Sequence, residues 1–455
     1  NNSGSYGETN TEGIYLASGG FLSIRDLDGN PETDDDATVI KPYGYNVPAN
    51  GWDWFATWEI MGDQSNTSRL EIKNSILIDI WQSRVYGHDP LITGNHFIGT
   101  RDIFFYGDNL VYTNNSHNAK ELNVSRSTAG GVRAYDGDKA LISNNSFING
   151  GSTAIDLERR TNVSITNNQF SNLGSNVIWA GYKSSNITVN NNYFESVNTA
   201  IWAGNVSKLY FYDNDIINGT FGYSSYFSGS SLRVNNNNFT NCPANCLLTT
   251  NLNYHFNENI FITNNTFRNY NGNGILLGTG GTEHSNITVA NNTFFSAASG
   301  INIGTYSGQG LPENVNIIYN TFTNTTNAIT LESYSTWGIP VTGGSNYLIF
   351  ENLISGADKG ITGTIITSSY AKIRIKNNSF NVLEYGLDLV CDGSSSPMKN
   401  TRIVNNNIKT ENMGLSLRYC DGETLISANE IDSSRIGINL FQSQSTVENN
   451  EITGN

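Results

Sequence analysis

Four charged residues close together in the chain are candidates for carbohydrate chemistry. Asp136, Asp156 and Glu158 carry carboxylates, and Arg159 follows directly. In glycoside hydrolysis one carboxylic acid protonates the leaving group, while a second carboxylate activates water or attacks the sugar. Carboxylates on adjacent turns of a repeat would lie about 5 Å apart, and on alternate turns about 9 Å apart, which bracket the retaining and inverting geometries. These four residues are therefore the catalytic candidates if the protein is an enzyme.

Aromatic residues in the same stretch favour sugar binding without catalysis. Exposed indole rings pack on the C–H faces of sugars, while nearby polar groups take hydrogen bonds from the hydroxyls. The candidate glycan-binding residues are Trp179, Trp202, Tyr182, Lys183 and Arg133. Asp138 and Arg160 are expected on the same outward face. The alternative is that charges of neighbouring turns only pair with one another as solvated ion pairs.

A repeated asparagine positions all of these residues. It recurs at intervals of 20 to 32 residues, and an apolar residue follows two positions later, except that His117 occupies this place after Asn115. A fixed period of this size is typical of an array whose repeats bury their apolar faces on their neighbours. The repeated asparagines are Asn74, Asn95, Asn115, Asn145, Asn168, Asn192, Asn214, Asn237, Asn265, Asn292, Asn320, Asn352, Asn378, Asn406, Asn429 and Asn450.

One repeat, 154–170, shows the elements. Its sequence AIDLERRTNVSITNNQF alternates apolar and polar residues in two short runs, which predicts short strands with one buried face. Asn167 and Asn168 indicate a bend, because asparagine tolerates the left-handed backbone. Three short strands and three bends in 20–30 residues form one coil of a parallel β-helix, in which the repeated asparagines stack as a hydrogen-bonded ladder.

Alignment of the repeats on this ladder predicts which site residues are neighbours. Val132, Ile155, Ile178 and Ile201 fall at one inward position of successive turns. The residue after each of them is then outward, and these outward residues are Arg133, Asp156, Trp179 and Trp202.

With its Asn-Asn-x-Phe repeat, the chain resembles the right-handed parallel β-helix superfamily, the pectate-lyase-like solenoids, over about residues 70–455. The resemblance implies an all-β, right-handed parallel β-helix solenoid of about 16 rungs with an N-terminal cap. The superfamily contains polysaccharide lyases, glycosidases, tailspikes, adhesins and surface-layer proteins, so the fold alone assigns no activity. A lyase-like site of calcium-binding acids and an arginine base would use Asp136, Asp156 and Arg159. The paired aspartates and histidine of polygalacturonase-like members are missing.

The N-terminal segment, residues 1–62, lacks the repeat and is expected to form a cap or assembly segment before the β-helix of residues 63–455. It contains an acidic, glycine-bearing loop whose oxygen ligands suit Ca²⁺, although the EF-hand spacing is not met. A solvated acidic loop is the alternative. The candidate metal ligands are Asp26, Asp28, Asn30, Asp34 and Asp36.

The four cysteines predict two disulfides. Cys242 and Cys246 flank a tight loop, and Cys391 and Cys420 lie in Cys-Asp-Gly turns one repeat apart, within disulfide reach if the register allows. Disulfides form in oxidising compartments, so these pairs favour an exported protein.

Asparagine glycosylation sequons also favour export, although a chain rich in Asn, Ser and Thr produces some sequons by chance. Asn162, Asn186 and Asn286 each lie eight residues before the phenylalanine of their repeat and are expected to form an outward row. The candidate sites are Asn66, Asn114, Asn123, Asn144, Asn162, Asn186, Asn205, Asn218, Asn238, Asn264, Asn286, Asn291, Asn324 and Asn377.

Composition narrows the function. The net charge of −15 argues against nucleic acid as a partner, and no run of apolar residues is long enough to cross a membrane. The leading hypothesis is an extracellular glycosylated structural protein, a subunit of a filament, surface layer or spike. Copies are expected to assemble head to tail through the β-helix ends, with the segment 1–11 as a possible donated strand. The alternatives are a polysaccharide lyase or glycoside hydrolase, and a glycan-binding adhesin or tailspike.

Overall fold

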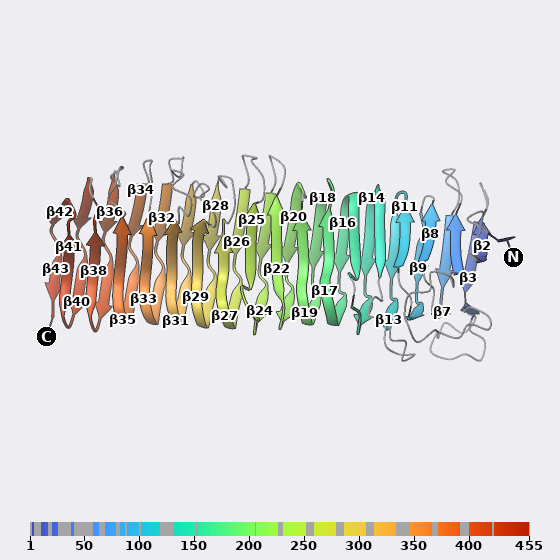
Figure 1. Ribbon diagram of the computed structural model, residues 1–455, viewed down its shortest axis with the longest axis horizontal. Helices are drawn as coiled ribbons and strands as arrows, with labels where there is room; N and C mark the ends of the chain where they lie inside the picture. Colours follow the sequence, from blue (N-terminus) through green and yellow to red (C-terminus); the bar gives the residue numbers. More distant parts are fainter. Residues whose placement is uncertain are drawn as a thin grey trace. The chain divides into compact units, whose positions relative to one another are not determined.

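The computed structural model describes residues 2–3, 11–16, 21–25, 38–40, 58–62, 69–78, 82–86, 89–99, 102–118, 131–151, 153–204, 206–225, 231–251, 259–278, 286–305, 314–333, 346–365, 372–391, 400–420 and 423–454. It divides into two compact units, residues 1–217 and 218–455. Every regular element of the described residues is a β-strand (Figure 1), so the expected all-β class is confirmed. Accordingly, no described helix is long and apolar enough to span a membrane.

The strands of the first unit are β1 (Asn2–Ser3), β2 (Thr11–Leu16), β3 (Phe21–Arg25), β4 (Thr38–Ile40), β5 (Trp58–Gly62), β6 (Arg69–Lys73), β7 (Ser75–Ile78), β8 (Gln82–Tyr86), β9 (Leu91–Thr93), β10 (His96–Ile98), β11 (Asp102–Tyr106), β12 (Leu110–Thr113), β13 (Ser116–Asn118), β14 (Val132–Ser143), β15 (Ser146–Ile148), β16 (Ile155–Thr166), β17 (Gln169–Gly181), β18 (Ser185–Asn190), β19 (Tyr193–Gly204), β20 (Lys208–Tyr212) and β21 (Asp215–Ile217).

The strands of the second unit are β22 (Thr220–Ser225), β23 (Ser231–Asn235), β24 (Asn238–Thr240), β25 (Leu247–Asn251), β26 (Asn259–Thr263), β27 (Thr266–Leu277), β28 (Ile287–Ala290), β29 (Thr293–Thr305), β30 (Val315–Ile318), β31 (Thr321–Ser333), β32 (Asn346–Phe350), β33 (Leu353–Ile365), β34 (Lys372–Lys376), β35 (Ser379–Cys391), β36 (Thr401–Val404), β37 (Asn407–Thr410), β38 (Met413–Arg418), β39 (Thr424–Ser427), β40 (Glu430–Ser433), β41 (Ile436–Phe441), β42 (Ser445–Glu448) and β43 (Glu451–Thr453).

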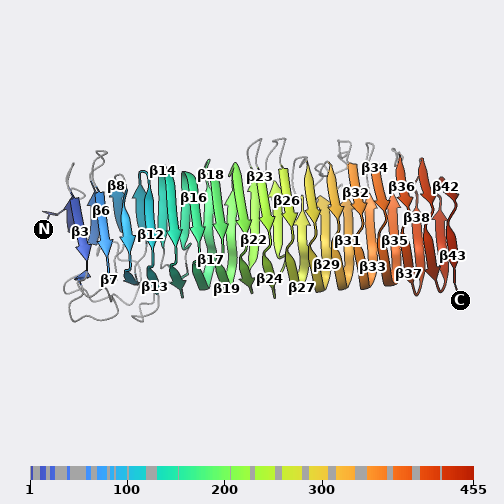
Figure 2. The same ribbon diagram turned by 180° about the vertical axis from the view of Figure 1, so that it is seen from behind.

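Parallel pairing between successive turns builds both units. β14 pairs with β16, β17 with β19, and β29 with β31, each in parallel, and the stacked strands are visible from both sides (Figures 1 and 2). The N-terminal strands join this pattern: β2 pairs with β5, β3 with β6 and β4 with β7 in parallel, while β1 pairs antiparallel with β2. The predicted boundary of a cap at residue 62 stays a prediction.

The expected asparagine ladder runs through each unit. In the first unit Asn168 Oδ1 accepts hydrogen bonds from the backbone nitrogen and from Nδ2 of Asn145, both at 2.9 Å. Asn168 Nδ2 in turn donates to the carbonyl of Ile142 in the preceding turn at 2.9 Å. In the second unit Asn265 and Asn292 repeat this arrangement. Each buried amide therefore satisfies backbone groups of the turn before it, and this fixes the register between turns.

The ladder prediction is wrong at Asn74. Ser75 occupies the equivalent place, and its backbone nitrogen donates to Asn95 Oδ1 at 3.1 Å. Asn74 lies one residue earlier, with a left-handed φ of 49°. Other turns place the residue before the ladder asparagine in the same conformation, as at Asn144 (φ 55°) and Asn167 (φ 56°). In an asparagine pair the first residue thus forms the left-handed bend and the second forms the ladder. In Asn74-Ser75 only the bend residue is an asparagine.

Phenylalanines stack behind the ladder in the core. Phe147 and Phe170 have ring centroids 5.2 Å apart, and Phe170 and Phe194 are 4.9 Å apart. His117 takes the place of a phenylalanine in this stack, 4.5 Å from Phe97 and 4.7 Å from Phe147. Stacked rings fill the interior at the same point of these turns, and isoleucine takes this place in others, as at Ile216 and Ile354.

We expect Asn265→Ala to reduce the free energy of unfolding by about 1–3 kcal/mol, because it leaves the buried backbone nitrogen of Asn237 and the carbonyl of Val234 without their partners. Asn302→Ala is the control. Asn302 is half-buried on β29 and no described group donates a hydrogen bond to its Oδ1, so its loss should cost little. Denaturant unfolding of both variants measures the difference, and equal losses would contradict the ladder role.

His117→Phe should remove part of the acid sensitivity of folding. Burial, with His96 adding a repulsive charge, lowers the pKa of His117 from 6.5 to about 3. Because the folded-state pKa lies below the unfolded-state pKa, the stability that His117 contributes is complete above about pH 6.5. It is lost as the pH falls toward 3, at up to about 1.4 kcal/mol per pH unit. The free energy of unfolding, measured from pH 4 to 8, should depend less steeply on pH for the variant. Identical slopes would refute this account.

Candidate functional site

The register of the first unit brings the predicted outward residues together. Arg133 pairs with Asp156, Asp156 with Trp179, and Trp179 with Trp202, on consecutive turns formed by β14, β16, β17 and β19. Val132, Ile155, Ile178 and Ile201, the residues before them, are fully buried. Since successive strand residues face opposite sides, the alignment deduced from the asparagine repeat is confirmed.

An ion-paired group occupies the first half of this column. Arg133 bridges two acids: its Nε lies 3.1 Å from Asp102 Oδ1, and its Nη1 pairs with Asp156 Oδ2. Tyr135 Oη donates a hydrogen bond to Asp156 Oδ2 at 3.0 Å. Asp156 is buried, with 6% of its surface exposed, rather than open to solvent. Burial raises the pKa of Asp156, and the charge of Arg133 opposes the rise.

Asp102 is a member of this group that sequence reasoning missed. It lies at the start of β11, in the turn before the turn of Arg133. Its side chain is mostly buried next to Arg133. The only signal in the sequence was an acid one turn ahead of an outward arginine.

A second ion pair lies at the adjoining bend. Arg159 Nη2 donates to Asp136 Oδ2 at 2.8 Å, and both residues have left-handed backbone, with φ of 50° and 46°. Arg159 Nη1 also lies 3.8 Å from Glu158 Oε2. The hydrogen bond from Arg159 lowers the pKa of Asp136, while desolvation raises the pKa of Glu158. The structure therefore pairs two of the candidate carboxylates with arginines, and it brings the third beside the same bend.

The predicted outward position of Arg160 is wrong. It was expected on the outward charged face, but the structure buries it completely. Its Nη2 donates to the carbonyl of Lys139 at 2.9 Å, and its Nη1 donates to the carbonyl of Gly107. Gly137 makes room, since a Cβ there would meet Arg160 Nη1 at 2.6 Å. Burial lowers the pKa of Arg160 to about 10. Arg160 ties three turns together and is not available to a ligand.

The two tryptophans share a motif that sequence reasoning also missed. Trp179-Ala180-Gly181 and Trp202-Ala203-Gly204 repeat one turn apart. Each indole reaches toward its own glycine: a Cβ on Gly181 would lie 2.9 Å from Trp179 Nε1, and one on Gly204 would lie 3.7 Å from Trp202 Nε1. Both tryptophans are half-buried rather than exposed. The glycines leave space for indoles to lie along the strand.

Tyr182 and Lys183 form the bend directly after Gly181, with φ of 45° and 68°. Tyr182 is 60% exposed, and Lys183 is exposed as well. We name Trp179, Trp202 and Tyr182 the aromatic surface. Of the predicted glycan-binding residues, Arg133 is the one whose guanidinium is already engaged by carboxylates.

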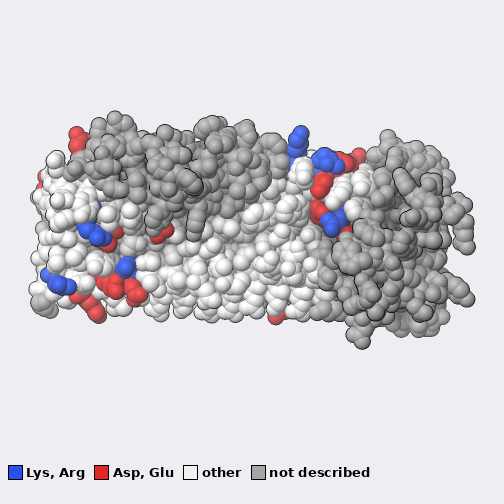
Figure 3. Space-filling model, viewed as in Figure 1, with Lys and Arg blue, Asp and Glu red and all other residues white. Residues whose placement is uncertain are grey.

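Charged groups are sparse on one face of the described surface. On the face drawn in Figure 3, charged side chains form a few separate groups on an otherwise uncharged described surface. The predicted metal ligands Asp26, Asp28, Asn30, Asp34 and Asp36 lie outside the described residues. Within the residues that are described, no three His, Cys, Asp or Glu side chains form a group that could hold a metal ion. A calcium site in the acidic loop stays a prediction.

Most of the sequon asparagines that the structure describes have a left-handed backbone, some of them within strands, as at Asn162 and Asn186. Ten are exposed with a left-handed φ between 53° and 61°, and these are Asn114, Asn144, Asn162, Asn186, Asn218, Asn264, Asn286, Asn291, Asn324 and Asn377. Asn238 differs, because it is half-buried within β24. Asn66, Asn123 and Asn205 lie outside the described residues. These side chains are accessible from solvent, and Nδ2 of Asn162 and of Asn186 donates to Asp138 Oδ1 and to Asn162 Oδ1.

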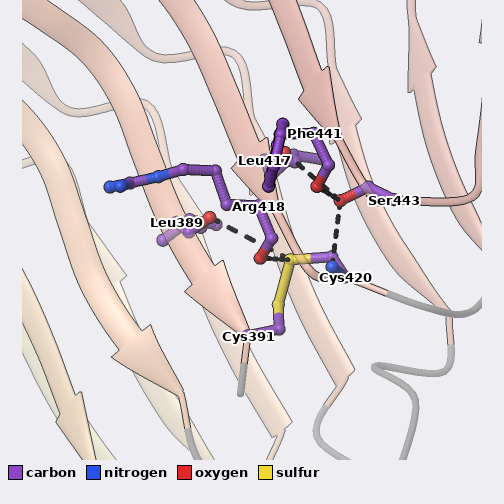
Figure 4. Close-up of a disulfide and its surroundings, with 7 residues drawn as sticks. All are labelled: Leu389, Cys391, Leu417, Arg418, Cys420, Phe441 and Ser443. Atoms are coloured by element: carbon purple, nitrogen blue, oxygen red, sulfur yellow. Dashed lines mark hydrogen bonds between the residues drawn. A yellow bond between two sulfur atoms is a disulfide. The ribbon is translucent and has the colours of Figure 1, made fainter. Parts of the chain in front are cut away.

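Both predicted disulfides are present. Cys242 is bonded to Cys246, and Cys391 to Cys420 across one turn, with Cα atoms 4.9 Å apart in the second pair. Figure 4 shows Cys420 held by Ser443, whose Oγ accepts a hydrogen bond from the Cys420 backbone nitrogen at 2.9 Å. The second disulfide therefore links the end of β35 to the turn that follows β38.

Comparison with protein families agrees with this architecture. The family model described as the right handed beta helix region matches residues 108–261. A search of curated proteins finds no significant match.

We expect Gly181→Ala to disturb the aromatic surface more than Gly204→Ala does. The added methyl group would meet Trp179 Nε1 at 2.9 Å and the Gly204 carbonyl at 3.3 Å, whereas at Gly204 it meets only Trp202 Nε1 at 3.7 Å. The Gly181 variant should lose about 1–3 kcal/mol of stability and shift the tryptophan emission, because overpacking moves the indole. The Gly204 variant should be close to neutral. The reverse order of effects in thermal unfolding and fluorescence would contradict the packing described.

Proposed function

Because the chain is a right-handed parallel β-helix, we propose that it is an extracellular, glycosylated structural protein, a subunit of a filament, surface layer or spike. The observation that carries the proposal is the placement of its sequons. Ten of them present an exposed asparagine with a left-handed backbone. Asn162 and Asn186 lie on consecutive turns, and Asn186 Nδ2 donates to Asn162 Oδ1 at 2.5 Å. Glycans attached there would form a row along one edge of the stacked turns.

The disulfides support export. Cys242–Cys246 and Cys391–Cys420 use all four cysteines of the chain. Disulfides persist in oxidising environments outside the cell and are rare in the cytosol. The Cys391–Cys420 bond also joins two turns covalently and so opposes a shift of register between them.

The state of the acids favours a structural role over catalysis. Asp156 is buried and paired with Arg133, and Asp136 is paired with Arg159. A general acid or a nucleophile has to reach the substrate, and the carboxylate of Asp156, buried against Arg133, is poorly placed for that task. The carboxylate of Asp136 is exposed but is held in an ion pair with Arg159. Assembly of copies head to tail is part of the proposal. Its support is the in-register parallel pairing of both units, which is the interaction that a second copy would extend.

A glycan-binding role for the aromatic surface is the second candidate. The repeated Trp-Ala-Gly motif places two indoles on consecutive turns beside the exposed Tyr182. Aromatic rings of this kind take the apolar faces of sugars. This role is compatible with a structural subunit, for which it would supply adhesion.

Peptide mapping of native secreted protein, without reduction, tests the proposal. We expect glycans on Asn162, Asn186 and Asn286 and both disulfides intact, with Asn238 unmodified as the internal control because it is half-buried in a strand. Imaging of the same material should show polymers, and deletion of residues 1–12 should diminish them. Bare asparagines together with four alkylatable thiols would contradict export.

A glycan array and a product assay on uronic polymers separate the alternatives. Binding lost in Trp179→Ala and Trp202→Ala, without turnover, would support adhesion. If the protein cleaves a polymer and Asp156→Ala abolishes this turnover, the proposed structural function is wrong and the protein is an enzyme.

A further inference from the structure

One strand of the second unit carries positive charge at every outward position. β34 has the sequence Lys-Ile-Arg-Ile-Lys from Lys372 to Lys376. Ile373 and Ile375 are fully buried, while Lys372 and Arg374 are exposed and Lys376 is partly exposed. Alternation along the strand therefore directs three cations to one side. This is unexpected in a chain with 25 basic and 40 acidic residues.

The next turn adds a fourth cation. Arg402 on β36 lies in register with Arg374 and is exposed. Neighbouring strands are about 4.8 Å apart, so the two guanidinium groups can approach one ligand together. We call Lys372, Arg374, Lys376 and Arg402 the basic strip.

The basic strip lacks carboxylate partners within the part of the chain that the structure describes. Other cations are paired, as Lys359 is with Glu384 and Arg418 with Asp388, but no such ion pair involves these four. The strands β32, β34, β36 and β39 contain no acidic residue. Along the chain the closest acid is Glu384, eight residues after Lys376. Glu351 lies in the bend after β32, where its backbone nitrogen donates to the carbonyl of Lys376 at 3.2 Å. Four cations that no carboxylate of the described residues neutralises are available to an anionic ligand.

Apolar side chains border the basic strip. Leu348 and Phe350 on β32 are half-buried and lie in register with Arg374 and Lys376. Phe350 packs edge to face with Tyr319, with centroids 5.8 Å apart, and Tyr319 is 47% exposed. The ligand that fits has anionic groups for the strip and apolar C–H faces for its border.

We propose that the basic strip binds a linear polysaccharide that carries sulfate groups. A carboxylate offers two oxygens in one plane, and a single bidentate guanidinium engages both of them. A sulfate ester has three terminal oxygens, so it can accept hydrogen bonds from Arg374 and Arg402 at the same time. Lys372 and Lys376, as point charges at the two ends of the strand, take further anionic groups of the same chain. Sugar rings between the sulfates lie against Leu348 and Phe350.

The narrow shape of the basic strip favours a thin polymer over a broad anionic surface. Its cations occupy one strand and a single position of the next. The net charge of the whole protein is −15. A membrane or a nucleic acid duplex is broader than the basic strip and would also face acidic parts of the surface, which would repel it. A single polysaccharide chain can follow the strip alone. The proposal concerns a different unit from the aromatic surface and does not depend on the function proposed above.

Fluorescence anisotropy with a labelled heparin octasaccharide tests the proposal. At low salt we expect binding that weakens as salt rises and becomes on the order of 10- to 100-fold weaker in the double variant Arg374→Gln, Arg402→Gln. The matched control is Lys409→Gln, Arg435→Gln, which removes the same charge from exposed positions outside the basic strip and should bind as the unmodified protein does. Unchanged melting temperatures would show that both variants are folded.

Further arms decide the chemistry of the ligand. A double variant with lysine in place of both arginines, Arg374→Lys and Arg402→Lys, keeps the charge but loses the bidentate hydrogen bonds. We expect the ratio of its affinity for the heparin octasaccharide to its affinity for oligogalacturonate to fall. The proposal is overturned if the octasaccharide does not bind, if the control pair loses as much affinity as the strip pair, or if the strip pair loses none. Tighter binding to oligogalacturonate, single-stranded DNA or phosphatidylserine vesicles would also overturn it and identify a different partner.

Discussion

A ladder of buried side-chain amides, from Asn95 to Asn214 in the first unit and from Asn237 to Asn429 in the second, holds the turns of this protein in register. The ladder asparagine accepts hydrogen bonds from the backbone and side chain of the preceding ladder residue, and it donates to a carbonyl of the preceding turn, as Asn168 does with Asn145 and Ile142. A shift of one residue would leave these buried groups unpaired and reverse the faces of the strands. Every surface described depends on this constraint, because the outward residues of successive turns become neighbours only when the register is kept.

The fold and the alignment of the site were predictable because both rest on local, repeated signals. The asparagine pair marks the bend, and alternation marks the inward face, so the column from Arg133 to Trp202 followed directly. The error at Asn74 has a simple cause. Both positions of the bend are usually asparagine, and a lone asparagine before Ser75 does not show which of the two it fills. The hydrogen bond from Ser75 to Asn95 identifies it.

Burial within the site was not predictable in the same way. Asp156 stands at an outward position, yet Arg133 and Tyr135 from the neighbouring turn cover it. Arg160 follows a left-handed residue that reverses the alternation, and it enters a space left by Gly137. Both outcomes depend on the lengths of side chains one turn away. The Trp-Ala-Gly motif could have been found in the sequence, since its glycines fall two residues after each tryptophan, but its meaning required the position of the rings.

The ladder also limits which changes of length this protein can tolerate during evolution. Each ladder link joins the same atoms in the same way, whether the turns are 20 or 32 residues long. Loss or duplication of a complete turn replaces one link with an identical link, and the flanking turns meet as before. Loss of a single residue within a strand instead breaks the link and inverts the faces beyond it. Natural variants should therefore differ by whole turns or by additions at bends, and the gene can grow in modules.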